Sequence, residues 1–95
     1  MAENYLVGFD AGRLKTPAFV VDEAALRRNL TRVDEVRERS GAKVLMALKA
    51  FALPAVFPLL REHMDGVCSS SPYESRLGRE KFGGHVHAFA PAYSR

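Results

Sequence analysis

The chain has 95 residues, enough for one small domain with a core and too few for two. Its 47% hydrophobic and 26% charged content is typical of an ordinary globular protein. The 14 Lys and Arg are interspersed with the 11 Asp and Glu, so the net charge of +3 forms no basic block, and we expect no nucleic-acid binding.

The compartment is predicted from the cysteine content and the N-terminus. A single cysteine, Cys68, excludes an internal disulfide and favours a reducing, cytoplasmic environment. The first ten residues contain acids at positions 3 and 10 and lack the apolar core region of a signal peptide. The longest uncharged apolar run, residues 50–60, is too short to span a bilayer and contains two prolines. We therefore expect a cytoplasmic protein without membrane contact.

The first third of the chain predicts a lead-in and one helix. Glycines and a proline punctuate residues 1–17, which are expected to be irregular. Residues 18–22, AFVVD, are a short β-rich run. Asp22 is placed to cap a helix over residues 23–39, where apolar residues recur at helical spacing and a Ser-Gly pair follows.

The middle of the chain predicts a strand, a helix and a second strand. Residues 43–48, KVLMAL, favour a strand buried on both faces, because their apolar residues do not alternate with polar ones. A helix is expected over residues 53–63, where Pro54 suits the first turn but Pro58 costs a hydrogen bond or bends the helix. The next strand is predicted over residues 66–70.

The segment SPYE, residues 71–74, is the clearest local signal in the chain. Ser71 can cap a helix, a proline occupies the first helical position, and Glu74 can close a capping box. This helix is expected to run to about Phe82 and to end at a Gly-Gly pair. Residues 86–91, VHAFAP, predict a further strand.

Strands thus recur about every twenty residues with a helix in each gap, which predicts βαβ units and a parallel sheet. Such sheets place their chemistry at the carboxyl ends of the strands, where Lys49 and residues 69–71 and 91–93 fall. Lys49 has two interpretations. Its stem can cover apolar neighbours while the ammonium reaches water, or partial desolvation can make the amine a nucleophile.

Other candidate sites have weaker support. His85 and His87 share one face of a predicted strand, and His63 or Cys68 could join them, but the spacing matches no closed zinc pattern and we predict no metal site. Cys68 is better explained as a small buried residue than as a nucleophile. The chain has no glycine-rich phosphate loop, which argues against nucleotide binding.

Three blocks of sequence closely resemble carboxynorspermidine (carboxyspermidine) decarboxylases: TPAFVVDEAALRRNL, the run from KVLMALKAFAL to SSSPYESRLGRE, and GGHVHAFAPAYS. The resemblance extends from Thr16 to Ser94. That family belongs to the pyridoxal-phosphate decarboxylases built like alanine racemase and eukaryotic ornithine decarboxylase. The resemblance implies an α/β fold that is the N-terminal part of a pyridoxal-phosphate-binding (β/α)8 TIM barrel. Since such a barrel takes about 250 residues, it is incomplete in this chain.

The resemblance also implies roles for particular residues. Lys49, in ALKAF, matches the lysine that holds pyridoxal 5′-phosphate, and Ala47 matches a small position beside that cofactor. Glu74 matches a glutamate of ornithine decarboxylases. Those enzymes carry an aspartate where this chain has Cys68, which argues against a plain ornithine decarboxylase.

The implied domain organisation is a lead-in over residues 1–17 and the N-terminal part of the barrel domain over residues 18–95. Residues 18–22 are a candidate strand of the family's separate β-domain, so that the barrel begins at residues 43–48. The rest of the barrel and of the β-domain are expected to be absent from the chain.

The implied function is the decarboxylation of carboxynorspermidine or carboxyspermidine to norspermidine or spermidine in polyamine synthesis. The implied partners are a small polyamine-type amino acid substrate and a second subunit in a homodimer. One alternative is another enzyme of the superfamily, such as a diaminopimelate or ornithine decarboxylase or an amino-acid racemase. The other is a catalytically silent fragment with an open sheet edge. The motifs SSPYE and FAPAYS favour the first function.

Overall fold

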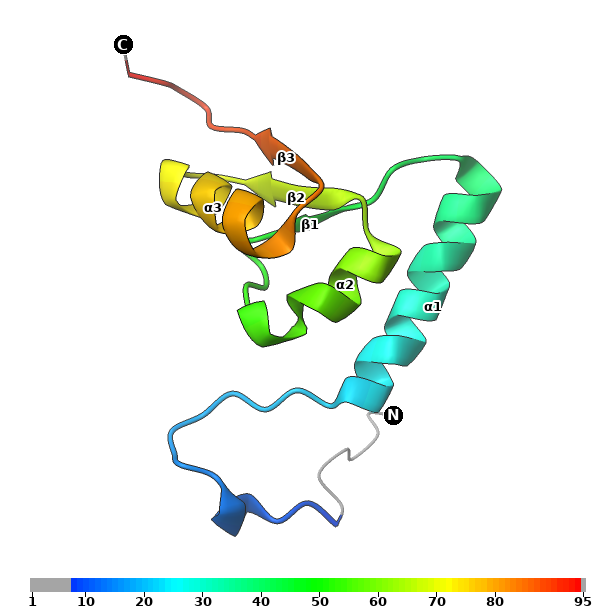
Figure 1. Ribbon diagram of the computed structural model, residues 1–95, viewed down its shortest axis with the longest axis vertical. Coiled ribbons are helices and arrows are strands. Elements are labelled where there is room, and N and C mark those ends of the chain that lie inside the picture. Colours follow the sequence, from blue (N-terminus) through cyan, green and yellow to red (C-terminus); the bar gives the residue numbers. More distant parts are fainter. Residues whose placement is uncertain (1–7, 95) are drawn as a thin grey trace.

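The computed structural model describes residues 8–94, in which helices and a small sheet follow an extended N-terminal segment (Figure 1). The lead-in predicted for residues 1–17 lies partly outside the described residues. Its described part holds one 3-10 turn, η1 (Ala11–Arg13), and is otherwise irregular and exposed. Residues 18–22 form no strand here, because no described strand pairs with them and no core covers them. Their assignment to the family's separate β-domain stays a prediction.

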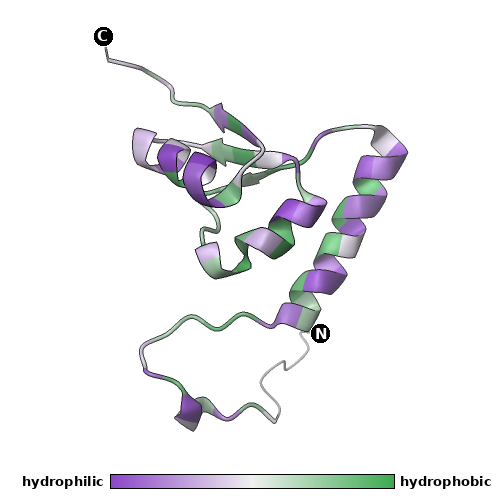
Figure 2. Ribbon diagram, in the orientation of Figure 1, coloured by the Kyte–Doolittle hydropathy of each residue, from purple (hydrophilic) through white to green (hydrophobic). Residues whose placement is uncertain are grey.

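Helix α1 (Glu23–Ser40) forms as the sequence predicts and is one residue longer. The Asp22 carboxylate accepts the N–H of Ala25 at 3.1 Å and so satisfies one of the free donors of the first turn. Gly41 ends the helix in the left-handed region, at φ 71°, where a side chain would be strained. Hydrophilic and hydrophobic segments alternate along α1 (Figure 2). Leu30 of this helix is buried in the core.

The sheet confirms the predicted parallel βαβ arrangement. Its three strands pair in the order β1-β2-β3, and both pairs are parallel. Each strand is shorter than the predicted one, because a strand of this sheet lasts only while its neighbour continues to pair with it. The observed strands are β1 (Leu45–Ala47), β2 (Gly66–Ser69) and β3 (His85–Ala88).

Two helical segments connect the strands. The first is a 3-10 turn, η2 (Pro54–Val56), followed by α2 (Phe57–His63). The hydrogen-bond loss or bend expected at Pro58 does not occur, because α2 begins at Phe57 and the proline occupies its first turn, where no N–H partner is needed. The second is α3 (Pro72–Leu77), which continues into a π-helical turn, η3 (Gly78–Phe82).

The core lies on one face of the sheet, under α2, α3 and η3 (Figure 1). Phe57 and Phe82 meet edge to face, with ring centroids 5.3 Å apart. The buried hydrophobic residues are Leu30, Met46, Leu48, Phe57, Leu60, Val67 and Phe82.

The other face of the sheet, called the open face below, carries the alternate residues of the strands. They are Leu45, Ala47, Gly66, Cys68, His85 and His87. Burial of residues 43–48 on both faces is therefore not observed. Met46 and Leu48 are buried, whereas the side chains of Leu45 and Ala47 are half-buried.

Candidate functional site at the carboxyl edge of the sheet

Lys49 stands in a tight turn immediately after β1. The N–H of Leu48 still bonds to the carbonyl of Cys68 on β2, at 3.1 Å. The Ala47 carbonyl then accepts the N–H groups of Ala50 and Phe51, at 3.0 and 3.2 Å, so the chain turns away from the sheet. Leu48 is buried and Lys49 is exposed, which leaves the amine accessible at the carboxyl end of the strand.

Ala47 lies on the open face, one strand pleat before Lys49. It is in register with Cys68 on β2, which is in register with His87 on β3. Paired residues of a parallel sheet project to the same side, so these three residues form one row across the open face. Ala47 and Cys68 are half-buried and His87 is exposed.

The predicted capping box after β2 is confirmed with one change in its partner. The Ser71 hydroxyl accepts the N–H of Glu74 at 3.1 Å. The Glu74 carboxylate accepts the N–H of Ser70, also at 3.1 Å, instead of that of the capping residue. Ser69 is fully buried and shares a hydrogen bond with the Ser75 hydroxyl on α3. The serine run is thus fixed against α3 by its own side chains.

A hollow of about 350 Å³ opens at the carboxyl ends of β2 and β3. Serine hydroxyls form one wall, and an apolar segment after β3 that includes Phe89 and Tyr93 forms the other. The Tyr93 hydroxyl donates to the Ala88 carbonyl at 3.4 Å. The structure therefore brings together two of the predicted strand-end segments, while Lys49 lies at the neighbouring strand end outside the lining of this hollow.

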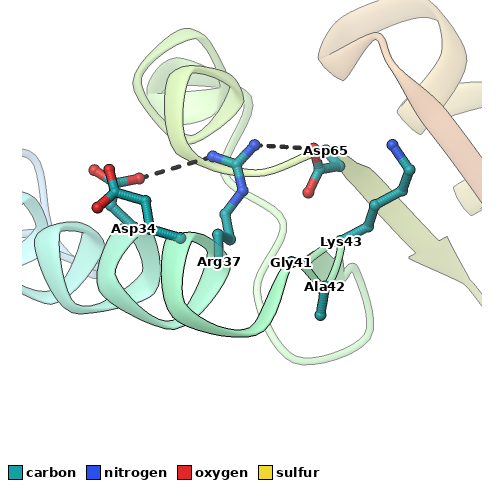
Figure 3. A pocket seen from close by; sticks show the side chains of 7 residues that line it. Asp34, Arg37, Gly41, Ala42, Lys43 and Asp65 are labelled. Carbon is teal, nitrogen blue, oxygen red and sulfur yellow. Dashed lines mark hydrogen bonds and ion pairs between the residues drawn. The ribbon is translucent and has the colours of Figure 1, made fainter.

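A second hollow, of about 390 Å³, lies at the opposite, amino edge of the sheet (Figure 3). There Arg37 donates to the His63 carbonyl at 2.7 Å and to the Asp65 carboxylate at 2.9 Å. Asp65 also accepts the N–H of Val44 at 2.8 Å. That backbone hydrogen bond, followed by the Arg37 guanidinium, holds the pKa of Asp65 below its ordinary value of 3.8. These contacts tie α1 to the starts of β1 and β2, a structural role.

The sequence did not predict this charged cluster. Asp34 and Arg37 stand three residues apart on one helix, and such a pair can be read from the sequence. Asp65 is 28 residues beyond Arg37, and its proximity depends on how α1 packs against the sheet.

The three histidines do not come together. His85 and His87 are exposed on the open face with ring centroids 6.0 Å apart, whereas His63 bonds to Asp34 at 2.8 Å near the amino edge. Within residues 8–94, no group of three or more histidine, cysteine or acidic side chains is arranged to hold a metal ion. Over the same residues, no helix has the length and apolar character needed to cross a membrane.

The accessible Lys49 amine and the small Ala47 side chain suit a flat aldehyde-bearing cofactor. The amine can form a bond to the aldehyde, and the methyl group of Ala47 leaves room above the open face. Parallel strands, connecting helices and a lysine at a strand end define a class, the parallel α/β proteins with a candidate nucleophilic lysine at the carboxyl edge.

Comparison with known proteins identifies the relatives within that class. No family model matches the chain. It is 54% identical, over 85% of its length, to a carboxynorspermidine/carboxyspermidine decarboxylase of Herminiimonas arsenicoxydans. It is 39% identical, over 97% of its length, to a carboxyaminopropylagmatine decarboxylase of Synechocystis.

A solved structure supports the same relationship. The crystal structure of carboxynorspermidine decarboxylase from Campylobacter jejuni, in complex with norspermidine, superposes with a TM-score of 0.80 and 34% identity over 85% of this chain. The resemblance found in the sequence is thereby confirmed: the chain matches a part of the carboxynorspermidine/carboxyspermidine decarboxylases. It spans 22% of the length of the Herminiimonas relative and 22% of the crystallised chain.

Proposed function

We propose that this chain is the lysine-bearing part of a pyridoxal-phosphate-dependent decarboxylase of carboxynorspermidine or carboxyspermidine, acting in polyamine synthesis. The observation that carries the proposal is Lys49, accessible at the end of β1 in a chain that matches such decarboxylases over 85% of its length. The three strands would be the opening part of a (β/α)8 barrel in a cytoplasmic homodimer.

Each residue of the candidate site has a defined task in this proposal. Lys49 would hold the cofactor through its amine, and Ala47 would leave room for the cofactor ring. Pyridoxal phosphate, when bound, supplies the electron sink that makes loss of carbon dioxide from an amino acid feasible. The turn that follows β1 keeps Lys49 at the strand end, because two N–H groups bond to the Ala47 carbonyl.

A second candidate substrate is carboxyaminopropylagmatine. The Synechocystis relative named for that substrate matches 97% of the chain, the broadest coverage among the relatives described above, although its identity is lower. Both substrates are amino acids with a long amine-bearing chain, and both would use Lys49 in the same way. Parallel assays of the two substrates would separate these functions by their relative rates.

The test of the proposal is the site of cofactor attachment. A chimera of the Herminiimonas relative, with this chain in place of the segment that it matches, supplies the remaining length. Borohydride reduction of the cofactor-loaded chimera, followed by peptide mapping, is expected to place the label on Lys49. Lys43 and Lys81 are internal controls, because Lys43 precedes β1 and Lys81 lies on η3. A label on either control lysine would refute the proposal.

A further inference from the structure

His87 stands at the β3 end of the row that crosses the open face. Ala47, Cys68 and His87 are in register on three successive strands. Neighbouring strands lie about 4.8 Å apart, so the row spans roughly 10 Å from β1 to β3. His87 is exposed, and its imidazole is a hydrogen-bond donor toward anions.

Lys49 is close enough to this row for one ligand to contact both. It follows Ala47 by two residues, within the turn whose N–H groups bond to the Ala47 carbonyl. Its amine stands on a flexible four-carbon stem in an exposed turn, so a ring attached to it can fold back over the open face. A cofactor that covers Ala47 therefore extends toward Cys68 and His87.

We infer that His87 belongs to the same ligand site as Lys49 and contacts a phosphate-bearing aromatic aldehyde held on that amine. The inference rests on the proposed function. The other titratable groups on the open face are the Cys68 thiol on β2 and the His85 imidazole on β3. The helical segments packed against β3 bring Arg79 and Glu80 beside Val86, whose side chain projects to the opposite face of the sheet.

The same sheet provides matched controls. His85 shares the open face with His87 but stands one pleat nearer to the amino edge, in the row of Leu45 and Gly66. His63 is bonded to Asp34 away from the open face. If the cofactor contacts His87, the protection of His87 from modification must therefore exceed that of His85, and His63 must show no protection.

The test measures the reactivity of each histidine of this chain within the chimera described above, which supplies the remaining length. The chimera is loaded with pyridoxal 5′-phosphate, reduced with borohydride and treated with diethylpyrocarbonate, and both modifications are then located by peptide mapping. A label on Lys49 is expected to slow the modification of His87 several-fold, to slow that of His85 less, and to leave His63 unchanged. Nuclear Overhauser contacts between the ring methyl of the label and the His87 imidazole are the second measurement.

Substitutions complete the test. His87→Gln is expected to lower the labelling of Lys49 relative to Lys43 several-fold, whereas His85→Gln leaves this ratio unchanged. Because both lysines are in one chain, partial unfolding would alter both signals. Two results would overturn this inference and leave the proposed function standing. One is equal protection of His85 and His87 while the label is on Lys49. The other is an equal ratio of Lys49 to Lys43 labelling in the two variants. A label on Lys43 in place of Lys49 would overturn the proposed function and this inference with it.

Discussion

At the scale of single residues, Ser71 and Glu74 show how two side chains fix the segment between β2 and α3. The Ser71 hydroxyl satisfies the N–H of Glu74, and the Glu74 carboxylate satisfies the N–H of Ser70. Both donors would otherwise be unpaired at a helix start. This local pattern could be predicted from four letters of sequence, because a capping box depends on residues that are adjacent in the chain.

Ser71→Ala should lower the free energy of unfolding by about 1 kcal/mol, the usual cost of losing a side-chain cap. Ser70→Ala is the matched control, since the exposed Ser70 contributes only its backbone N–H to the box. Chemical denaturation of both variants provides the measurement. In the cofactor-binding chimera, the affinity for pyridoxal phosphate should hardly change. If affinity collapses while stability holds, Ser71 binds a ligand and the capping role is secondary.

Asp65 should make the stability of the chain depend on acid pH. Its folded-state pKa lies below 3.8, chiefly because of the Val44 N–H and then the Arg37 guanidinium. A lowered folded pKa means that the carboxylate stabilises the fold above the unfolded value, and that this contribution disappears as the pH falls through the folded value. Asp65→Asn should therefore flatten the pH dependence of unfolding below about pH 4.

The control for this substitution is Glu38→Gln. Glu38 lines the same hollow at the amino edge without contributing to the Arg37–Asp65 ion pair. Thermal unfolding scans across the acid range would compare both variants with the original chain. A pH profile that Asp65→Asn leaves unchanged would mean that other carboxylates control the acid transition.

At the scale of elements, η3 is placed by a glycine. A Cβ atom at Gly78 would collide with a side-chain methyl of Val67 on β2, so the turn can rest directly on the sheet only without a side chain. The i→i+5 bond from Gly83 to the Gly78 carbonyl, at 2.9 Å, widens the turn. Phe82 at its end then packs against Phe57 in the core.

Gly78→Ala should destabilise the chain by roughly 1–3 kcal/mol, the range for overpacking a tight contact. Val67→Ala removes the colliding methyl groups, so Gly78→Ala should cost less in that background than in the original one. Denaturation of the two single variants and the double variant completes the cycle. Additive losses would show that the contact with Val67 does not limit the position of η3.

The sequence predicted the elements of the sheet and its connecting helices well, because hydrophobic runs and capping signals are local. It did less well at positions that depend on neighbours far along the chain. Residues 18–22 have β-rich composition but no described partner strand. Pro58 disturbs nothing because α2 begins one residue before it. Cys68 and His87 enter one row only through the parallel register of β2 and β3, which no short motif encodes.

At the scale of the whole molecule, the main incomplete feature is the described sheet, with its two unpaired edges and its open face. The chain spans 22% of the Herminiimonas relative. In the described part of the chain, β1 and β3 each pair on one side only, and Phe89, directly after β3, is exposed. Unpaired edges beside apolar surface favour association with another chain.

The 95-residue chain alone should therefore lack decarboxylase activity and should self-associate or be only marginally folded. Lys49 can bind an aldehyde, but orientation of the cofactor and tuning of its ring require further protein groups. Size-exclusion chromatography, hydrogen exchange and carbon dioxide release from carboxynorspermidine would measure these properties. A compact, protected monomer that turns over substrate would contradict this expectation.

The most direct test of the central claim is norspermidine formation by the chimera described above. With this chain in place of the matching segment, the chimera should convert carboxynorspermidine to norspermidine, and Lys49→Arg should abolish conversion while Lys43→Arg preserves it. Because arginine keeps the positive charge but does not supply the lysine amine, this comparison isolates the chemistry of Lys49. A folded chimera whose Lys49→Arg variant still forms norspermidine at the original rate would contradict the assignment.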